Sequence, residues 1–209
     1  MAQGLDLTHL DTWIRRHVPE FQGPLTAEKF SGGQSNPTFK LTAGDRQYVL
    51  RRKPQGTLLA SAHAVDREFK VLSALSSTNV PVPVPVALCE DETIIGSMFY
   101  VMEYLEGRIF WDPALPEVND ADRGEIYDQM NQVLADMHNV DIHAVGLSDY
   151  GKPGNYFERQ IGRWTKQYRA AETTRIAAME KLIEWLPNHM PEDDGRVSLV
   201  HGDYRLDNM

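Results

Sequence analysis

The sequence is poor in the features that mark secreted, membrane-spanning and nucleic-acid-binding proteins. It has a single cysteine, Cys89, so an intrachain disulfide framework is excluded. No apolar run approaches the roughly 18 residues that a membrane-spanning helix needs. Asp6, His9 and Asp11 interrupt the apolar residues near the N-terminus, so no signal peptide is expected. Because the net charge is −9, a nucleic-acid surface is not expected either. The sequence therefore predicts a cytoplasmic protein with neither a membrane nor a nucleic acid as partner.

Motifs of several common enzyme classes are also missing. The chain has no HExxH for zinc chemistry, no GxSxG for a serine nucleophile and no GxGxxG of the protein-kinase type. Its 209 residues are 42% hydrophobic and 24% charged, the composition of an ordinary globular protein with one large or two small domains. Function must therefore be sought in less common motifs.

The first half of the chain has the pattern of a small sheet with helices. Apolar residues at helical spacing predict an amphipathic helix over 6–18. A second helix is predicted over 61–75, with Ser61 as candidate N-cap, and Ala43-Gly44-Asp45 predicts a hairpin turn. Short segments of β-type composition lie at residues 27–31, 37–43, 47–52, 86–90 and 98–104.

The second half changes to a helical pattern after Gly107. Helices are predicted over 120–138, 155–171 and 173–186, and the apolar run 197–200 predicts a buried strand. We therefore expect an α+β fold, with an N-terminal lobe at 1–105 and a partial helical C-terminal lobe at 106–209.

The helix predicted over 155–171 has two unlike faces. The apolar face is expected in the core and consists of Phe157, Ile161, Trp164, Tyr168 and Ala171. The basic face is either solvated or an anion-binding surface, and consists of Arg159, Arg163, Lys166 and Arg169.

A Gly-rich segment separates the first two predicted strands. Gly32 and Gly33 would let the backbone turn tightly and direct several N–H groups at a phosphate, and Ser35 and Asn36 would add side-chain donors. A Gly-Gly pair in a hairpin can also be no more than a turn. The segment is a candidate phosphate-binding loop that needs support from elsewhere in the chain.

The third predicted strand and the helix after it offer that support. Val49 and Arg51 share one face of the strand and Leu50 lies on the other, so a small apolar residue precedes a cation as a nucleotide pocket requires. Glu68 lies within the apolar stripe of the helix, where a carboxylate is costly unless it meets a cation such as Arg51. The alternatives are a solvated strand end and a Glu68 that reaches solvent.

The segment that joins the two halves also offers groups to a nucleotide. Met102 would line the back of a pocket, and Glu103 and Leu105 would offer main-chain groups to an adenine edge. The alternative is a strand without a ligand.

The most specific motif lies at the end of the sequence. Asp203 and Asn208 stand five positions apart after a predicted strand, which is the Asp-to-Asn spacing of the protein-kinase catalytic loop. A carboxylate suits a substrate hydroxyl, and hard oxygen ligands suit Mg²⁺. His201 would anchor the loop and Gly202 would permit a tight turn. The alternative is a polar tail with this spacing by chance.

Taken in order, these motifs resemble the aminoglycoside phosphotransferase and choline kinase-like superfamily, a relative of the protein kinases. The resemblance covers the chain from about residue 27 to its end. The stretches 63–69 and 163–169 further resemble phosphotransferases related to the kinase domain of certain acyl-CoA dehydrogenases. The resemblance implies a protein-kinase-like two-lobed fold, with an antiparallel-sheet N-lobe carrying one helix. It also implies ATP- and Mg²⁺-dependent transfer of a γ-phosphoryl group to the hydroxyl of a small molecule, such as a hydroxyacyl-CoA-type metabolite.

The resemblance also implies roles for individual residues. Asp203 would be the catalytic base, Asn208 a magnesium ligand, and Arg51 a phosphate contact held by Glu68, with the loop 32–36 over the phosphates. The chain departs from the protein-kinase pattern at Arg51, where kinases have Lys, and at Gly202, where they have Arg. The second metal-binding Asp of the family has no counterpart. A truncated form is therefore expected, and a catalytically inactive nucleotide-binding or scaffolding module is the alternative.

Overall fold

The structure is a computed structural model that describes residues 5–30, 36–54 and 64–209. The predicted loop residues Gly32, Gly33 and Ser35, and the candidate N-cap Ser61, lie outside the described residues. The chain divides into two compact units, Met1–Asp141 with Val200–Met209, and Ile142–Leu199. The predicted lobe boundary between residues 105 and 106 stays a prediction.

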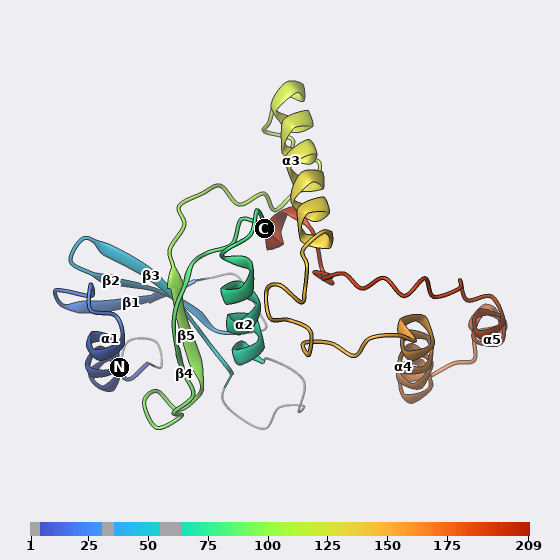
Figure 1. Cartoon of the computed structure of the whole chain (residues 1–209), viewed down its shortest axis with the longest axis horizontal. Coiled ribbons are helices and arrows are strands. Elements are labelled where there is room, and N and C mark those ends of the chain that lie inside the picture. Colours follow the sequence, from blue (N-terminus) through green and yellow to red (C-terminus); the bar gives the residue numbers. More distant parts are fainter. Residues whose placement is uncertain (1–4, 31–35, 55–63) are drawn as a thin grey trace. The chain divides into compact units, whose positions relative to one another are not determined.

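A five-stranded antiparallel sheet forms the centre of the first unit (Figure 1). Its order is β1-β2-β3-β5-β4, with strands at Leu25–Lys29 (β1), Thr38–Ala43 (β2), Arg46–Arg52 (β3), Pro85–Cys89 (β4) and Phe99–Glu103 (β5). The predicted hairpin is confirmed, because Ala43 pairs with Arg46 and leaves a two-residue loop in which Gly44 has φ +57°. The predicted antiparallel sheet is therefore confirmed.

One face of this sheet packs against α1, Leu7–His17. Leu10 and Ile14 of α1 are fully buried in one cluster with strand residues that include Phe39 and Leu50. Cys89 of β4 is buried in the same cluster. Since Leu50 faces α1, its neighbours Val49 and Arg51 point to the opposite face, as alternation along β3 predicted.

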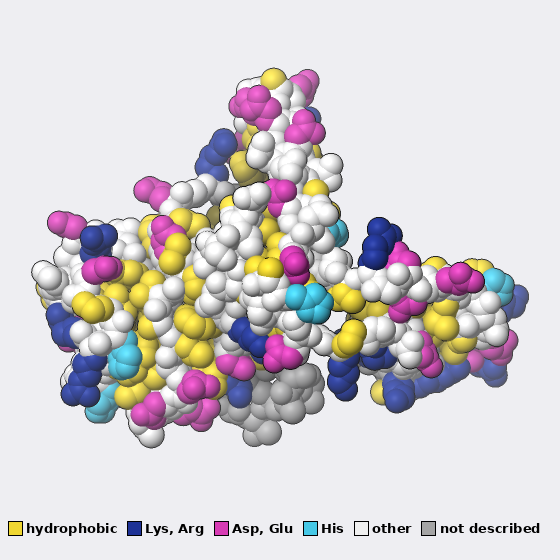
Figure 2. Space-filling view, in the orientation of Figure 1, with side chains coloured by type: hydrophobic (Ala, Val, Ile, Leu, Met, Phe, Trp, Pro, Cys, Tyr) yellow, Lys and Arg dark blue, Asp and Glu magenta, His cyan; other side chains and the backbone are white. Residues whose placement is uncertain are grey.

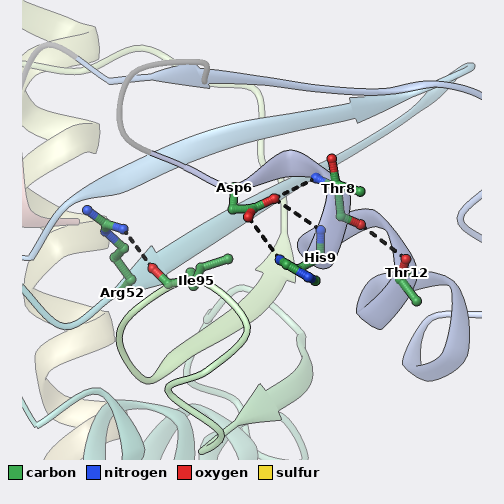
Figure 3. Close-up of polar contacts among 6 residues, drawn as sticks. All are labelled: Asp6, Thr8, His9, Thr12, Arg52 and Ile95. Atoms are coloured by element: carbon green, nitrogen blue, oxygen red, sulfur yellow. Dashed lines mark hydrogen bonds and ion pairs between the residues drawn. The ribbon is translucent and has the colours of Figure 1, made fainter.

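Two sets of polar contacts fix the start of α1 and the end of β3 (Figure 3). The Asp6 carboxylate caps α1, accepting hydrogen bonds from the backbone N–H groups of Thr8 at 3.0 Å and His9 at 3.2 Å. Arg52 is buried and donates from Nη1 to the Ile95 carbonyl at 3.3 Å, which ties β3 to the turn before β5.

The second face of the sheet packs against α2, Val65–Leu75. Phe69 of α2 contacts the ring of Tyr100, whereas Trp13 of α1 contacts the ring of Phe99. Because consecutive strand residues point to opposite faces, α1 and α2 lie on opposite sides of the sheet. The described helix begins at Val65 with Ala64 as its N-cap, and the predicted start at residue 61 lies outside the described residues.

The helical part of the first unit holds the terminal loop. Helix α3, Asp120–His138, has the predicted bounds, and its Met130 carbonyl accepts a hydrogen bond from the Tyr204 hydroxyl at 2.5 Å. The loop ends in a 3-10 turn, Leu206–Asn208, in which Leu206 is buried. The Tyr204 side chain therefore fixes the terminal loop to α3.

The second unit contains two helices, α4 (Tyr156–Ala171) and α5 (Ala177–Trp185), followed by a 3-10 turn at Leu186–Asn188. The α4 prediction is confirmed within one residue, whereas α5 is shorter than predicted. Arg169 of α4 forms ion pairs with Glu180 at 2.5 Å and with Glu172 at 3.2 Å. The Arg169–Glu180 pair joins the two helices.

Two apolar segments predicted to be buried lie at the surface instead. On α4, Phe157 is 49% and Trp164 is 61% exposed, and hydrophobic side chains are visible over the surface of this unit (Figure 2). Residues 197–200 form no strand, and Val197 and Val200 are 53% and 60% exposed. Both predictions are wrong for one reason: apolar sequence favours burial only where another element packs or pairs with it. Among the described residues no strand pairs with 197–200, and within the second unit little packs on α4.

A membrane-spanning helix was not expected. Among the helices of residues 5–30, 36–54 and 64–209, none has the length and apolar character needed to cross a bilayer.

Candidate active site

An ion pair joins β3 to α2 on the face of the sheet opposite α1. The Arg51 Nε donates to Glu68 Oε2 at 2.7 Å, so the cation predicted for Glu68 is the one it meets. The two side chains are 30% and 33% exposed, which leaves the pair open to solvent on one side. A charge at this position is therefore accessible to a ligand.

Glu68 receives two more hydrogen bonds, and the sequence indicated neither of them. Asn36 Nδ2 donates to Oε1 at 2.8 Å, and the Tyr100 hydroxyl donates to Oε2 at 3.2 Å. Burial, reinforced by the Glu68 charge, raises the pKa of the Tyr100 hydroxyl, so it stays protonated and acts as a donor. The donor of Asn36, predicted for a phosphate, is directed at Glu68. Phosphate contact by Asn36 stays a prediction.

The strand register brings further residues to the same face. Val49 pairs with Met102 on one side and with Lys40 on the other. The Lys40 Nζ lies 4.2 Å from the centre of the Tyr104 ring. Sequence analysis missed Lys40, although the two-residue hairpin loop fixes its position opposite Val49.

Glu103 and Leu105, whose main-chain groups were predicted to contact an adenine edge, differ in their hydrogen bonding and exposure. The Glu103 N–H donates to the Val84 carbonyl at 2.9 Å, and the Glu103 carboxylate accepts from the Val84 N–H at 3.2 Å. A purine contact at Glu103 would therefore use its carbonyl oxygen. Leu105 follows β5 outside regular structure and is 56% exposed.

The terminal loop closes on itself around the predicted catalytic pair. Asn208 Nδ2 donates to the Asp203 carboxylate at 2.8 Å and to the Asp203 carbonyl at 3.0 Å. Gly202 has φ +87°, the conformation that glycine permits, and the Asp203 N–H donates to His201 Nδ1 at 3.3 Å. The predicted turn at Gly202 and the anchoring by His201 are confirmed. The bonds hold the carboxylate and the amide in a fixed mutual orientation.

The chemistry of this loop fits a magnesium ion bound together with a phosphate. The amide nitrogen of Asn208 donates its hydrogen bonds to Asp203, so the amide oxygen is the atom that suits a hard cation. No group of three His, Cys, Asp or Glu that could hold a metal occurs among the described residues. Mg²⁺ commonly keeps several waters and binds through one or two protein oxygens and the substrate phosphates, so a sparse protein donor set suits it.

The structure thus forms two local arrangements from the predicted site residues. One is a strand cation held by a helix carboxylate, and the other is a loop that holds an Asp and an Asn in contact. Together with the antiparallel sheet that carries α2, they define a kinase-like phosphotransferase as the class of protein.

Comparison with known proteins gives the family. The model described as "Phosphotransferase enzyme family" matches residues 26–209, and the chain belongs to that family. Acyl-CoA dehydrogenase family member 10 of Mus musculus is 54% identical over 187 residues, a match that spans 90% of this chain but 17% of the mouse protein. The chain is therefore similar to a small part of that relative.

Solved structures confirm the predicted fold. A candidate aminoglycoside phosphotransferase from Ralstonia eutropha is 54% identical with a TM-score of 0.87, and the match covers 98% of this chain and 60% of that one. The ternary complex of APH(2")-IIa with streptomycin and ATP is 17% identical with a TM-score of 0.51, covering 80% of this chain and 54% of that one. The second likeness concerns the fold alone.

Proposed function

We propose that this chain carries the nucleotide and catalytic elements of an ATP- and Mg²⁺-dependent phosphotransferase that acts on a small-molecule hydroxyl. The contact between Asp203 and Asn208 carries the proposal, because it sets a proton acceptor beside an oxygen ligand for Mg²⁺. The Arg51–Glu68 ion pair adds a cation for the phosphates. An ATP complex of a protein with the same fold supports the choice of nucleotide.

In the proposed reaction, each residue has a limited task. Asp203 accepts the proton of the acceptor hydroxyl as its oxygen forms a bond to the γ-phosphorus, and the bond from that phosphorus to the bridging oxygen of ADP breaks. Arg51 binds phosphate oxygens and Glu68 holds Arg51 in place. Val49 and Met102 line the base, with the main chain at Glu103 and Leu105 along its edge. When bound, Mg²⁺ would neutralise phosphate charge, and Asn208 would be its ligand from this chain.

The acceptor is proposed as a class only. Similarity to a protein of the acyl-CoA dehydrogenase family favours a hydroxylated acyl-CoA or a related metabolite over an antibiotic. The loop 32–36, of which residues 32–35 lie outside the described residues, is proposed to cover the phosphates through Gly32, Gly33 and Ser35.

The test is ADP release from Mg-ATP across a panel of hydroxylated metabolites that includes hydroxyacyl-CoA esters. We expect Asp203→Asn to lower turnover by about 10²- to 10⁴-fold, the usual contribution of a general base. Mg-ATP affinity should change little, because the substitution leaves the cation–carboxylate pair intact. Asp128→Asn, an equal chemical change on exposed α3, is the control and should keep wild-type turnover.

Equal turnover by Asp203→Asn and the wild type would exclude Asp203 as the base. Magnesium-dependent stabilisation by ATP with no turnover on any acceptor would instead favour a nucleotide-binding module without catalysis.

A further inference from the structure

We propose that the Tyr100 hydroxyl is a positioning group that orients Arg51 through Glu68. The inference deepens the proposed function and rests on it wherever nucleotide binding is concerned. Its starting point is that Tyr100 and Arg51 donate to the same carboxylate oxygen, Glu68 Oε2, at 3.2 Å and 2.7 Å. Asn36 holds the other oxygen, Oε1, at 2.8 Å. The carboxylate is therefore held from three sides.

The sheet places two of these donors, Arg51 and Tyr100, in one row with Thr38. Thr38 of β2 pairs with Arg51 of β3, which pairs with Tyr100 of β5. Residues paired across neighbouring strands point to the same face, with side chains about 5 Å apart. Glu68 approaches this row from α2, so one carboxylate reaches two members of it. The placement of Arg51 and Tyr100 side by side follows from strand register.

Stability alone does not account for three donors on a carboxylate that is one-third exposed. An ion pair that is 30% and 33% exposed contributes at most about 1 kcal/mol once solvent screens it. On its own, such a pair would let two long side chains move among several geometries. Tyr100, by contrast, is 2% exposed, and its ring is held against Phe69. Its hydroxyl gives the partly solvated pair a fixed point of attachment.

The ion pair with Glu68 leaves the two terminal nitrogens of the Arg51 guanidinium for other partners. Arg51 uses Nε for Glu68, and Nη1 lies 3.5 Å from Thr38 Oγ1. Within the described part of the chain, no hydrogen bond occupies Nη2. A guanidinium held through Nε presents its two terminal nitrogens in a fixed plane, the geometry that suits two phosphate oxygens. Tyr100 thereby sets the direction in which Arg51 presents its donors.

The experiment compares Tyr100→Phe with Tyr48→Phe in the whole 209-residue chain. Tyr100→Phe keeps the ring that packs on Phe69 and removes only the hydroxyl. Tyr48→Phe removes a hydroxyl from the opposite face of the same sheet, where Tyr48 packs against Phe21. The first measurement is the ¹H–¹⁵N signal of the Arg51 Nε–H and its exchange with water, assigned by its loss in Arg51→Lys. The second is the Kd of Mg-ATP by calorimetry.

We expect Tyr100→Phe to shift the Arg51 Nε–H signal, to speed its exchange severalfold and to raise the Kd of Mg-ATP about tenfold. Glu68→Gln should change the signal in the same direction by more, and Tyr48→Phe should change neither quantity. An Arg51 signal that moves in Glu68→Gln but not in Tyr100→Phe would overturn the proposal. An equal change in Tyr48→Phe would overturn it too, because the effect would then be a general loosening of the sheet.

The signal comparison separates this proposal from the proposed function. If wild-type protein binds no nucleotide, the proposed function fails, whereas the response of Arg51 to Tyr100→Phe still decides whether Tyr100 positions it.

Discussion

Asp6 and Glu68 are both carboxylates with several donors, yet their surroundings give them different tasks. Asp6 lies at the start of α1 and accepts from two backbone N–H groups and from His9 Nδ1 at 2.9 Å. Glu68 lies between α2 and the sheet and accepts only from side chains. The first arrangement begins a helix, whereas the second fixes a cation.

The contacts of Asp6 predict a pH-dependent stability. The hydrogen bond from the His9 side chain, with those from the backbone, lowers the pKa of Asp6 below 3.8. A lowered folded-state pKa contributes stability that is complete above the unfolded-state value and is lost as pH falls through the folded-state value. Wild type should therefore be more stable than Asp6→Asn at pH 7, and the difference should shrink as pH falls below 3.8 towards the lower folded-state pKa.

Urea unfolding of both proteins between pH 7 and pH 3 checks this prediction. Asp128→Asn is again the control and should show no such trend. A difference for Asp6→Asn that grows towards low pH would contradict the assigned sign.

Sequence reasoning identified the partner of Glu68 but not its full surroundings. A carboxylate within an apolar stripe needs a cation, and Arg51 on the preceding strand was the natural one. Tyr100 comes to the same oxygen through the pairing of β3 with β5, strands that are separated by some 46 residues. No local pattern specifies a register over that distance, so this part of the candidate site required the structure.

At the scale of elements, a capping residue marks where α3 begins. Asn119 precedes α3, accepts from the Asp122 N–H at 2.9 Å and donates to the Asp122 carboxylate at 2.9 Å. The two side chains satisfy backbone and side-chain groups at the helix start, in the manner of a capping box. The predicted bounds of α3 were correct because this signal is local.

Removal of that cap should destabilise the protein. We expect Asn119→Ala to lower the free energy of unfolding by about 1 kcal/mol. Asn131→Ala is the matched control, because it makes the same change at an exposed interior position of α3 and should be neutral or slightly stabilising. Urea denaturation of both variants measures the effect, and an equal loss in the two would rule out capping as its cause.

Strand prediction succeeded or failed according to the presence of a partner. The hairpin of β2 and β3 was predictable, because Gly44 in a short turn brings two adjacent strands together. Residues 197–200 have the apolar composition of a strand but no paired strand among the described residues. Composition indicates what a segment could bury, whereas pairing depends on the rest of the fold.

At the scale of the whole molecule, the buried core belongs to the first unit. Trp13 is 9% exposed and lies in the cluster between α1 and the sheet. The other tryptophans, Trp111, Trp164 and Trp185, are between 51% and 66% exposed. The four indole rings therefore report on two kinds of environment.

Tryptophan fluorescence should separate those environments. We expect acrylamide to quench most of the emission readily and to leave one resistant component. Trp13→Phe should remove that component, whereas Trp164→Phe should leave it. A resistant component lost in Trp164→Phe would mean that α4 is covered in solution.

The buried thiol in β4 has a practical consequence. Cys89 is 2% exposed, and burial raises the pKa of its thiol, so it stays protonated and unreactive. Cysteines introduced at the surface would therefore take up maleimide dyes in preference to the native one. Energy transfer between two such dyes, one on α2 and one beside Asp203, would measure whether the distance between these two elements changes when Mg-ATP is added.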